Sequence, residues 1–351
     1  MISRPQRRQP SSAATTKEYP DIQTIRNAIP AHCFEPSTWR SLGYVLRDVT
    51  MAISLGWAAL TYIPSLPNSL WRGAAWMAYG YAQGLVCTGI WILAHEAGHG
   101  AFSVHRTLNN IVGWVLHSSL MVPYFSWKFS HHRHHRFTGH MDKDMAFVPM
   151  TAADRSQPRF MDLYIDLEHL EDVPIVQFAR LIAHQLVGWQ TYLLFNSSAG
   201  VKSKQRDESS WWRLSHFDPT SAVFRPNEAA YIALSDLGLG LTFSVLYYAS
   251  TIVGWYSVCL VYVIPYLWVH HWLSKSNCLQ LLHSTIVLMH LNCLVAITYL
   301  HHNHPDVPHY SDEGWTFVKG NLATIDRDFG WIGRHLFHGI IDTHVVHHLF
   351  P

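Results

Sequence analysis

Four apolar stretches, each long enough to cross a bilayer, constrain this fold more than any other feature of the sequence. They are residues 45–64, 74–94, 229–250 and 252–270. A helix of about 20 residues crosses the roughly 30 Å of hydrocarbon in a membrane. Charged residues make up only 14% of the chain and hydrophobic residues 49%, a composition typical of membrane proteins. We therefore expect an all-α integral membrane protein with about four transmembrane helices in two hairpins.

Basic residues indicate which side of the membrane holds the N-terminus. The arginines that precede or begin the first apolar stretch include Arg4, Arg7, Arg8, Arg40 and Arg47. Cytoplasmic segments carry such an excess of positive charge. Residues 1–40 are polar and have no apolar core of a secretory signal, so we expect a disordered or amphipathic cytosolic segment there. Residues 41–351 form the expected membrane domain.

Histidines form three clusters beside the apolar stretches: His95 and His99 in HEAGH, His131, His134 and His135 in HHRHH, and His344, His347 and His348 in HVVHH. Spacings of three and four residues place imidazoles on one face of a helix. Eight imidazoles exceed the ligand number of one metal ion, and nitrogen-rich ligation suits iron. The three clusters, called the histidine boxes below, therefore predict a site for two metal ions.

A zinc metalloprotease is the alternative that the first box alone allows. HEAGH fits the pattern HExxH, in which Glu96 would be the general base. That reading leaves the other two boxes unexplained. The apolar segment 107–126 joins the first two boxes, and we expect it to be a buried or interfacial helix, so that both boxes face one compartment. We also expect residues 178–195 to lie as a helix on the membrane surface.

Four carboxylates near the boxes are candidates for orienting ligand imidazoles through a ring N–H: Glu96, Asp142, Asp144 and Asp342. A solvated carboxylate is the alternative, favoured most for Asp142. We assign no catalytic residue apart from the metal ligands. Five further histidines are left off the ligand set: His105, His117, His132, His301 and His304.

The sequence resembles the membrane-bound fatty acid desaturases, and most closely the oleate Δ12 desaturases of fungi and plants. The similarity includes LAHEAGHGAFS at 93–103, residues 112–149 around HHRHH, LVGWQTYLLFN at 186–196, and the C-terminal LVAITYLHHNHPDVPHY and IDTHVVHHLFP. The resemblance implies a cytosol-facing helical cap with a histidine-ligated di-iron site, oxygen as co-substrate, and electrons from cytochrome b5 and its NADH-dependent reductase. It also implies a ninth ligand in YLHHNHP, which maps onto His302, and an endoplasmic reticulum location.

The activity implied is introduction of a cis double bond at Δ12 of oleoyl chains to give linoleoyl lipids, with reduction of O2 to water. Sister activities use the same boxes: ω3 desaturase, hydroxylase, acetylenase and epoxygenase. The acyl carrier stays open between phospholipid and coenzyme A, and the resemblance specifies no oligomeric state. A net charge of +1 and the lack of basic runs with interleaved aromatics exclude a nucleic-acid partner.

Two regions depart from the relatives that the resemblance suggests. About twenty extra residues, at 273–293, stand between a PYLW-type segment and LVAITYL, and with them residues 281–300 become an apolar stretch. We expect this stretch to bulge at the cytosolic surface, because polar side chains disfavour a crossing. The chain also stops at Pro351, just after the third box, which we interpret as C-terminal truncation. An inactive, mis-spliced paralogue is therefore a third hypothesis.

Overall fold

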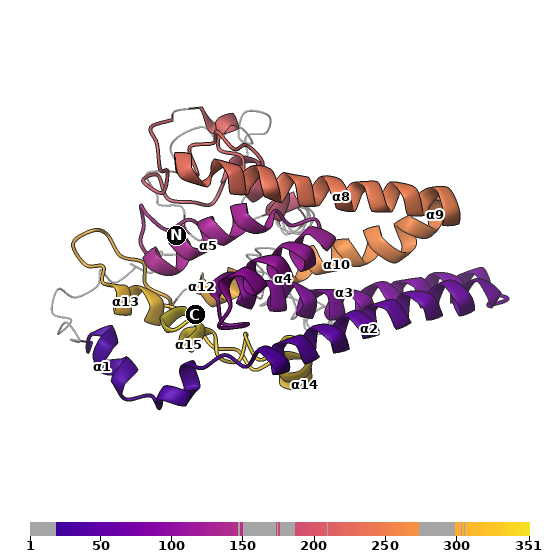
Figure 1. Ribbon diagram of the computed structural model, residues 1–351, viewed down its shortest axis with the longest axis horizontal. Coiled ribbons are helices and arrows are strands. Elements are labelled where there is room, and N and C mark those ends of the chain that lie inside the picture. Colours follow the sequence, from indigo (N-terminus) through magenta and orange to yellow (C-terminus); the bar gives the residue numbers. More distant parts are fainter. Residues whose placement is uncertain are drawn as a thin grey trace, which may run out of the picture.

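The computed structural model describes residues 19–146, 148–149, 173, 175, 187–208, 210–273, 299–302, 304 and 306–351. Regular structure in this part of the chain is helical, and extended backbone pairs only in one isolated bridge between His140 and Tyr310. The predicted all-α class is confirmed for the described residues. Figure 1 shows two long helical hairpins that extend side by side from a less regular body.

The first hairpin consists of α2 (Thr38–Tyr62) and α3 (Ser69–His99), joined through the short helix η2 (Ile63–Ser65). The Asn68 side chain accepts a hydrogen bond from the Leu70 N–H and so caps the start of α3. Gly100 ends α3 in the left-handed conformation, with φ of 89°. The helix is about 46 Å long. It continues past the predicted span 74–94 and carries the first histidine box in its last turns.

The start of α2 differs from the predicted span 45–64. The helix begins at Thr38, and its buried Asp48 is paired with Arg47 and His338. By length and apolar composition, two helices of the described part are able to cross a membrane, at Ser69–His99 and Pro226–Val253, and α2 is not one of them. The N-terminal half of α2 thus belongs to the body of the molecule, because its charged groups are bound there.

The second hairpin starts with η5 (Pro226–Glu228) and α8 (Ala229–Val253) and reverses at Gly254, where φ is 81°. The return consists of α9 (Trp255–Val258), the π-helical turn η6 (Cys259–Val263) and α10 (Ile264–Leu273). Close packing joins this return to α3, since a Cβ added at Gly84 would lie 2.5 Å from the Cβ of Trp268. Small residues allow two membrane helices to approach in this way.

Two short helices occupy the region expected as one helix over 107–126. They are α4 (Arg106–Ser119) and α5 (Tyr124–Phe137), separated by Met121 with φ of 55° and by Pro123. At 14 residues each, they are about 21 Å long and too short to cross a bilayer. Both early boxes therefore stay on one side, as predicted. Of the helix expected at 178–195, residues 187–195 are described and are helical.

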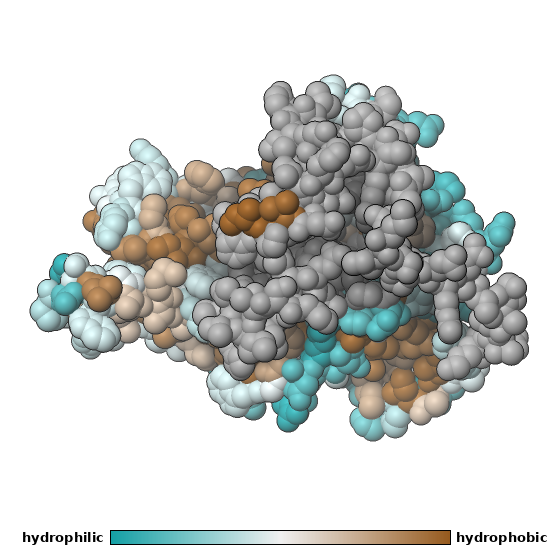
Figure 2. Space-filling model, turned by 180° about the vertical axis from the view of Figure 1, so that it is seen from behind, coloured by the Kyte–Doolittle hydropathy of each residue, from teal (hydrophilic) through white to brown (hydrophobic). Residues whose placement is uncertain are grey.

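Large apolar side chains face outward along the hairpins. On α8 they include Leu237, Leu241, Phe243 and Val245. Exposed aromatic side chains gather at the ends far from the boxes: Trp57, Tyr62, Trp71, Tyr247, Tyr248, Trp255 and Tyr256. Seen from behind, the projecting part has hydrophobic residues along it and paler residues at its tips (Figure 2). An apolar band that ends in Trp and Tyr is typical of a membrane-embedded surface.

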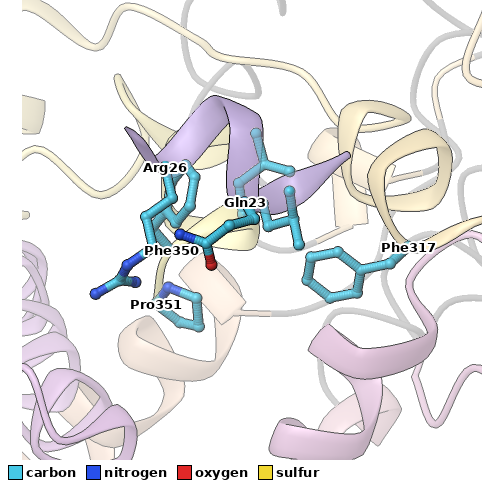
Figure 3. A pocket seen from close by; sticks show the side chains of 7 residues that line it. Gln23, Arg26, Phe317, Phe350 and Pro351 are labelled. Atoms are coloured by element: carbon cyan, nitrogen blue, oxygen red, sulfur yellow. The ribbon is translucent and has the colours of Figure 1, made fainter. Parts of the chain in front are cut away.

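The body at the other end contains short helices: α1 (Ile22–Asn27), η1 (Ala31–Phe34), η4 (Trp211–Arg213), α12 (Tyr299–His302), α13 (Phe317–Leu322), α14 (Gly330–His335) and α15 (His344–Leu349). Helix α1 lies beside the last residues around a hollow of about 430 Å³ (Figure 3). The rings of Phe34 and Phe350 pack edge to face with centroids 5.6 Å apart. The predicted segment 1–40 thus includes an ordered part that contacts the third-box segment.

Other expectations fall on residues that the structure does not describe. They concern residues 1–18, positions 274–293 of the expected insertion, and residues 281–298 of the adjoining apolar stretch.

Candidate metal centre

All nine predicted ligands meet at the end of α3. His95 and His99 come from the last turns of α3, and the second box comes from α5. His302 is the last residue of α12, and the third box lies on α15. Most of these imidazoles are buried. Four helices from distant parts of the sequence thus direct imidazoles into one region.

The imidazoles fall into two groups, which we call the first and second histidine groups. The first contains His95, His99, His131, His135 and His347, and the second contains His134, His302 and His348. Within each group, one nitrogen per ring lies within 4.8 Å of all the others. His344 adjoins the second group, with its Nε2 3.1 Å from Nε2 of His302. The arrangement is therefore five imidazoles beside four.

Distances between nitrogens test whether metal ions fit these groups. Nε2 of His131 lies 2.7 Å from Nε2 of His95 and 3.0 Å from Nε2 of His135. Two ligands at about 2.1 Å from one ion and at right angles to each other are about 3.0 Å apart. Nε2 of His99 and Nε2 of His347 are buried and have no hydrogen-bond partner among the described residues. Because buried polar atoms are rarely left unsatisfied, the residues fit a pair of metal ions.

Two carboxylates orient imidazoles of this centre. Nδ1 of His95 donates a hydrogen bond to Oε1 of Glu96 at 2.8 Å. Nδ1 of His134 donates to Oδ1 of the fully buried Asp144 at 2.7 Å. Fixing Nδ1–H in this way directs Nε2 toward the metal position, as in many protein metal sites. The predicted orienting contacts of Glu96 and Asp144 are confirmed.

The other two carboxylates make no such contact. Asp142 pairs with Lys202 at the surface, its Oδ2 lying 2.6 Å from Nζ, which agrees with the solvated alternative. Oδ1 of Asp342 accepts a hydrogen bond from the backbone N–H of Phe329 at 3.1 Å. The orienting role predicted for Asp342 is therefore wrong. Its carboxylate stabilises the turn before α14 instead of an imidazole.

Two polar side chains near His348 were missed from the sequence. Its Nδ1 lies 3.1 Å from Oγ1 of Thr138 and 3.3 Å from Oδ1 of Asn321. Thr138 follows the second box by three residues, and this proximity was an available signal. Asn321 lies on α13, and no local pattern marks it. Both side chains contact Nδ1 of His348 and leave its Nε2 for a metal ion, as the carboxylates do for His95 and His134.

Burial favours the neutral form of six imidazoles outside α3. It lowers the pKa of most of them well below the ordinary value, and neighbouring imidazoles add to the effect: His131, His135, His302, His344 and His348. Burial likewise lowers the pKa of His347 to about 3. The carboxyl of Asp144 loses hydration on burial, yet His134 and two backbone N–H groups outweigh this and lower its pKa. Neutral imidazoles are the form that binds metals.

A second buried network joins α2 to the segment before the third box. Oδ2 of Asp48 accepts a hydrogen bond from Nε2 of His338 at 2.8 Å, and Nη2 of Arg47 donates to the carbonyl of His335 at 2.8 Å. Asp48 and His338 are 290 positions apart, so spacing gave no indication of this pair. An acidic residue inside an apolar stretch was the only signal. The network fixes the chain that leads into α15.

Four of the five histidines left off the ligand set have other side-chain contacts. Nε2 of His132 donates to the carbonyl of Gly98 at 2.9 Å, and Nε2 of His117 donates to the carbonyl of Trp91 at 3.2 Å. The ring of His301 lies beside that of His344, with centroids 4.3 Å apart. His304 pairs with Asp306 at 3.4 Å near the surface.

Two hairpins with apolar surfaces, joined to a body in which nine imidazoles cluster, define a helical membrane protein with a candidate two-metal centre. The sequence model described as fatty acid desaturase matches residues 74–351, and a domain of unknown function matches residues 17–59. The chain therefore belongs to the fatty acid desaturase family, whose members are membrane-bound oxidoreductases. Membership excludes the metalloprotease alternative. The carboxylate of Glu96 agrees, because it binds a ligand imidazole instead of standing free as a base.

Relatives with different products are about equally similar to this chain. An oleate hydroxylase of Claviceps purpurea is 42% identical over 338 residues, which cover 93% of this chain and 66% of the relative. A Δ12 fatty acid desaturase of Mortierella isabellina is 43% identical, with 94% of this chain and 76% of the relative covered. A Δ12 acyl-lipid conjugase of Momordica charantia is 38% identical, covering 94% and 73%. The chain thus spans about two thirds to three quarters of these proteins.

Proposed function

We propose that this protein introduces a cis double bond at Δ12 of oleoyl chains to give linoleoyl lipids, with reduction of O2 to water. The observation that carries the proposal is the gathering of nine imidazoles into groups of five and four. Similarity to the Δ12 desaturases of two Mortierella species, each 43% identical, supports the position of the double bond.

The nine histidines are the proposed ligands of two iron ions. Iron bound there supplies the oxygen chemistry needed to remove hydrogen from an unactivated methylene. The chain's own residues hold and orient the imidazoles: Glu96 and Asp144 fix the ring tautomers. Trp91 stacks on His95 and Trp127 stacks on His131, so indoles cover one side of the first group and exclude water. No separate catalytic base is part of the proposal.

The proposed topology is a multi-pass protein of the endoplasmic reticulum with four crossings in two hairpins and the metal centre facing the cytosol. Arg40 and Arg47 support this orientation, because they lie at the end of α2 that contacts the metal-centre body. Residues 41–351 form one membrane domain in this proposal. Electrons come from cytochrome b5 and its NADH-dependent reductase, and the substrate is a membrane lipid or acyl carrier.

Hydroxylation of oleoyl chains is the second candidate function. It is favoured by the 42% identity to the Claviceps purpurea oleate hydroxylase, which is similar to this chain over nearly the same residues. Both reactions require cleavage of an unactivated C–H bond of the acyl chain, so the same ligand set suits either.

The test is the fatty acid profile of yeast that makes no polyunsaturated lipids and expresses this chain. Linoleate is the expected product, and His344→Ala abolishes it because one of the nine proposed ligands, the imidazole that adjoins the second group, is lost. His304→Ala is the matched control and retains product, since His304 pairs with Asp306 away from the groups. A hydroxylated product instead of linoleate selects the second candidate. Product that appears only after deletion of residues 273–293 identifies the mis-spliced form, and no product from either version contradicts the proposal.

A further inference from the structure

A small pocket outside the metal centre lies between α4, α5 and α8. Its volume is about 190 Å³, and it is lined by Arg106, Asn110, Phe125, Lys128, Phe129, Asn227, Glu228 and Tyr231. This is below the usual size of a pocket for a drug-sized molecule, and it is large enough for a single polar group. The pocket lies one helical turn before the second box on α5. It is therefore at the end of the hairpins that holds the histidines.

Two cations line this pocket without forming an ion pair to any described residue. Nζ of Lys128 donates a hydrogen bond to Oδ1 of Asn110 at 2.8 Å, and Lys128 is only partly exposed. Arg106 is exposed at the first position of α4. Burial lowers the pKa of Lys128 to about 8, and the positive charge of Arg106 adds to the effect. Two like charges converge here, an arrangement that an anion would stabilise.

The one carboxylate of the pocket is already bound. Both oxygens of Glu228 accept hydrogen bonds from Nη2 of Arg133, at 2.6 Å and 2.5 Å, and the pair is largely buried. Oε2 also accepts from the backbone N–H of Arg225. Glu228 is therefore turned toward Arg133, and it does not neutralise Lys128 or Arg106.

Exposed apolar side chains lead away from the pocket along two helices that contact each other. They are Ile111 and Val115 on α4, and Leu234 and Leu237 on α8. Nε1 of Trp114 donates to the carbonyl of Leu234 at 2.8 Å and holds α4 against α8. A basic pocket at the head of an apolar surface matches a lipid with a phosphate head and acyl tails.

We infer that Arg106, Lys128 and Asn110 form a binding site for the phosphate of a membrane phospholipid, whose acyl chains lie along α4 and α8. The commitment to a membrane lipid follows from the apolar surface that begins at the pocket, since a soluble phosphoryl compound would leave that surface uncovered. This inference rests on the membrane location of the hairpins and is independent of the proposed reaction.

Native mass spectrometry of the purified full chain in detergent tests the site. Dioctanoyl phosphatidic acid is the probe, and dioctanoylglycerol has the same acyl chains without the phosphate. We expect at least fivefold greater retention of the phosphatidic acid, and a ratio near one for the double variant Arg106→Gln and Lys128→Gln. Lys128→Arg keeps the preference. Arg40→Gln is the matched control, because it removes an exposed cation of α2 outside the pocket.

Four outcomes overturn the inference. One is equal retention of the two lipids by the unaltered chain, and another is an unchanged preference in the double variant. If the double variant melts at a lower temperature than the unaltered chain, the single variant Arg106→Gln, at an exposed position, is measured in its place. The third outcome is then a phosphatidic acid preference of Arg106→Gln that stays above half of the original. The fourth is displacement of the lipid by an equal concentration of octanoyl coenzyme A or inorganic phosphate, which identifies a soluble ligand. A chain that desaturates in yeast but shows no preference loses this inference alone.

Discussion

Asp142 and Asp144 stand two residues apart after the second box, and their surroundings are opposite. Asp144 is fully buried and accepts hydrogen bonds from Nδ1 of His134 and from the backbone N–H groups of Gly139 and Ala146. Asp142 pairs with Lys202 at the surface. Only the buried carboxylate orients a proposed ligand, so the two residues form a matched pair for experiment.

Asp144→Asn is expected to lower iron affinity. The amide is neutral, so it weakens the hydrogen bond that fixes the tautomer and angle of His134. Loss of such an orienting contact costs about 10- to 100-fold in metal affinity. Iron per chain, measured by mass spectrometry across a chelator series, should fall for Asp144→Asn and stay unchanged for Asp142→Asn. Equal iron binding by the two variants would show that Asp144 has no orienting role.

The spacing of the histidine boxes was sufficient to predict that their imidazoles converge. It did not predict how the imidazoles divide between the first and second histidine groups. Helical periodicity places His131, His134 and His135 on one side of α5, yet adjacent His134 and His135 belong to different groups. That division depends on the positions of α12 and α15, which local sequence does not encode. For the same reason, local sequence did not indicate the contacts of Asp48 and Asp342. Asp48 binds His338, 290 positions away, and Asp342 accepts a hydrogen bond from a backbone N–H that no motif marks.

A buried ion pair joins α5 to the end of η5, just before α8. Arg133 donates to both oxygens of Glu228, and the two side chains are only 11% and 12% exposed. Arg133 lies between the second-box histidines, so this pair also fixes the rotation of α5. A buried pair is costly to break, because the remaining charge loses its partner without regaining water.

Glu228→Gln should destabilise the protein by about 3–5 kcal/mol, the usual cost of leaving one buried charge uncompensated. Arg133→Gln combined with Glu228→Gln should recover part of this loss, since no unpaired charge remains. Thermal melting of the purified protein in detergent measures both effects. A double variant that is less stable by the sum of the two single effects would mean that the side chains act independently.

The packing of α3 against α10 provides another matched pair on one helix. A Cβ at Gly84 would meet Trp268 at 2.5 Å, whereas a Cβ at Gly73 meets nothing within 4 Å. We expect Gly84→Ala to destabilise by about 1–3 kcal/mol, because the helices must separate. Gly73→Ala should be neutral or slightly stabilising, since alanine favours a helix. Similar melting temperatures for the two variants would contradict the close approach seen here.

Hydropathy predicted the positions of the helices more accurately than it predicted which parts of them are apolar enough to cross a membrane. Helix α8 begins at Ala229, where the third apolar stretch was predicted to start, and a helix covers 45–64 almost entirely. A hydropathy average over the apolar stretch does not show that Asp48 forms ion pairs with Arg47 and His338. These ion pairs hold the start of α2 in the body of the molecule. Likewise, the break between α4 and α5 arises at Met121 and Pro123, within a stretch whose composition alone suggested one helix.

At the scale of the molecule, the metal-free protein should lose stability in acid. Burial lowers the pKa of six histidines of the cap from an ordinary value of 6.5: His131, His135, His302, His344, His347 and His348. As the pH falls below 6.5, the unfolded chain binds protons that the folded chain does not, so the free energy of unfolding decreases. Each such residue contributes about 1.4 kcal/mol of loss at pH 5.5.

Thermal melting of the iron-free protein between pH 7.5 and 5.5 measures this dependence. The melting temperature should fall with pH over the whole interval below 6.5. His348→Gln should give a shallower dependence, because one titrating group is removed. A flat profile would show that the imidazoles are accessible to protons in the folded state.

Helix α5 supplies imidazoles to both histidine groups, with His131 and His135 in one and His134 in the other. Two metal ions bound in these groups would therefore share α5, and each would be held only when that helix has the correct rotation. If binding of one ion orders α5, binding of the second ion costs less conformational entropy of the protein. We therefore expect metal loading of the two positions to be cooperative, so that chains with a single ion are scarce relative to chains with none or two.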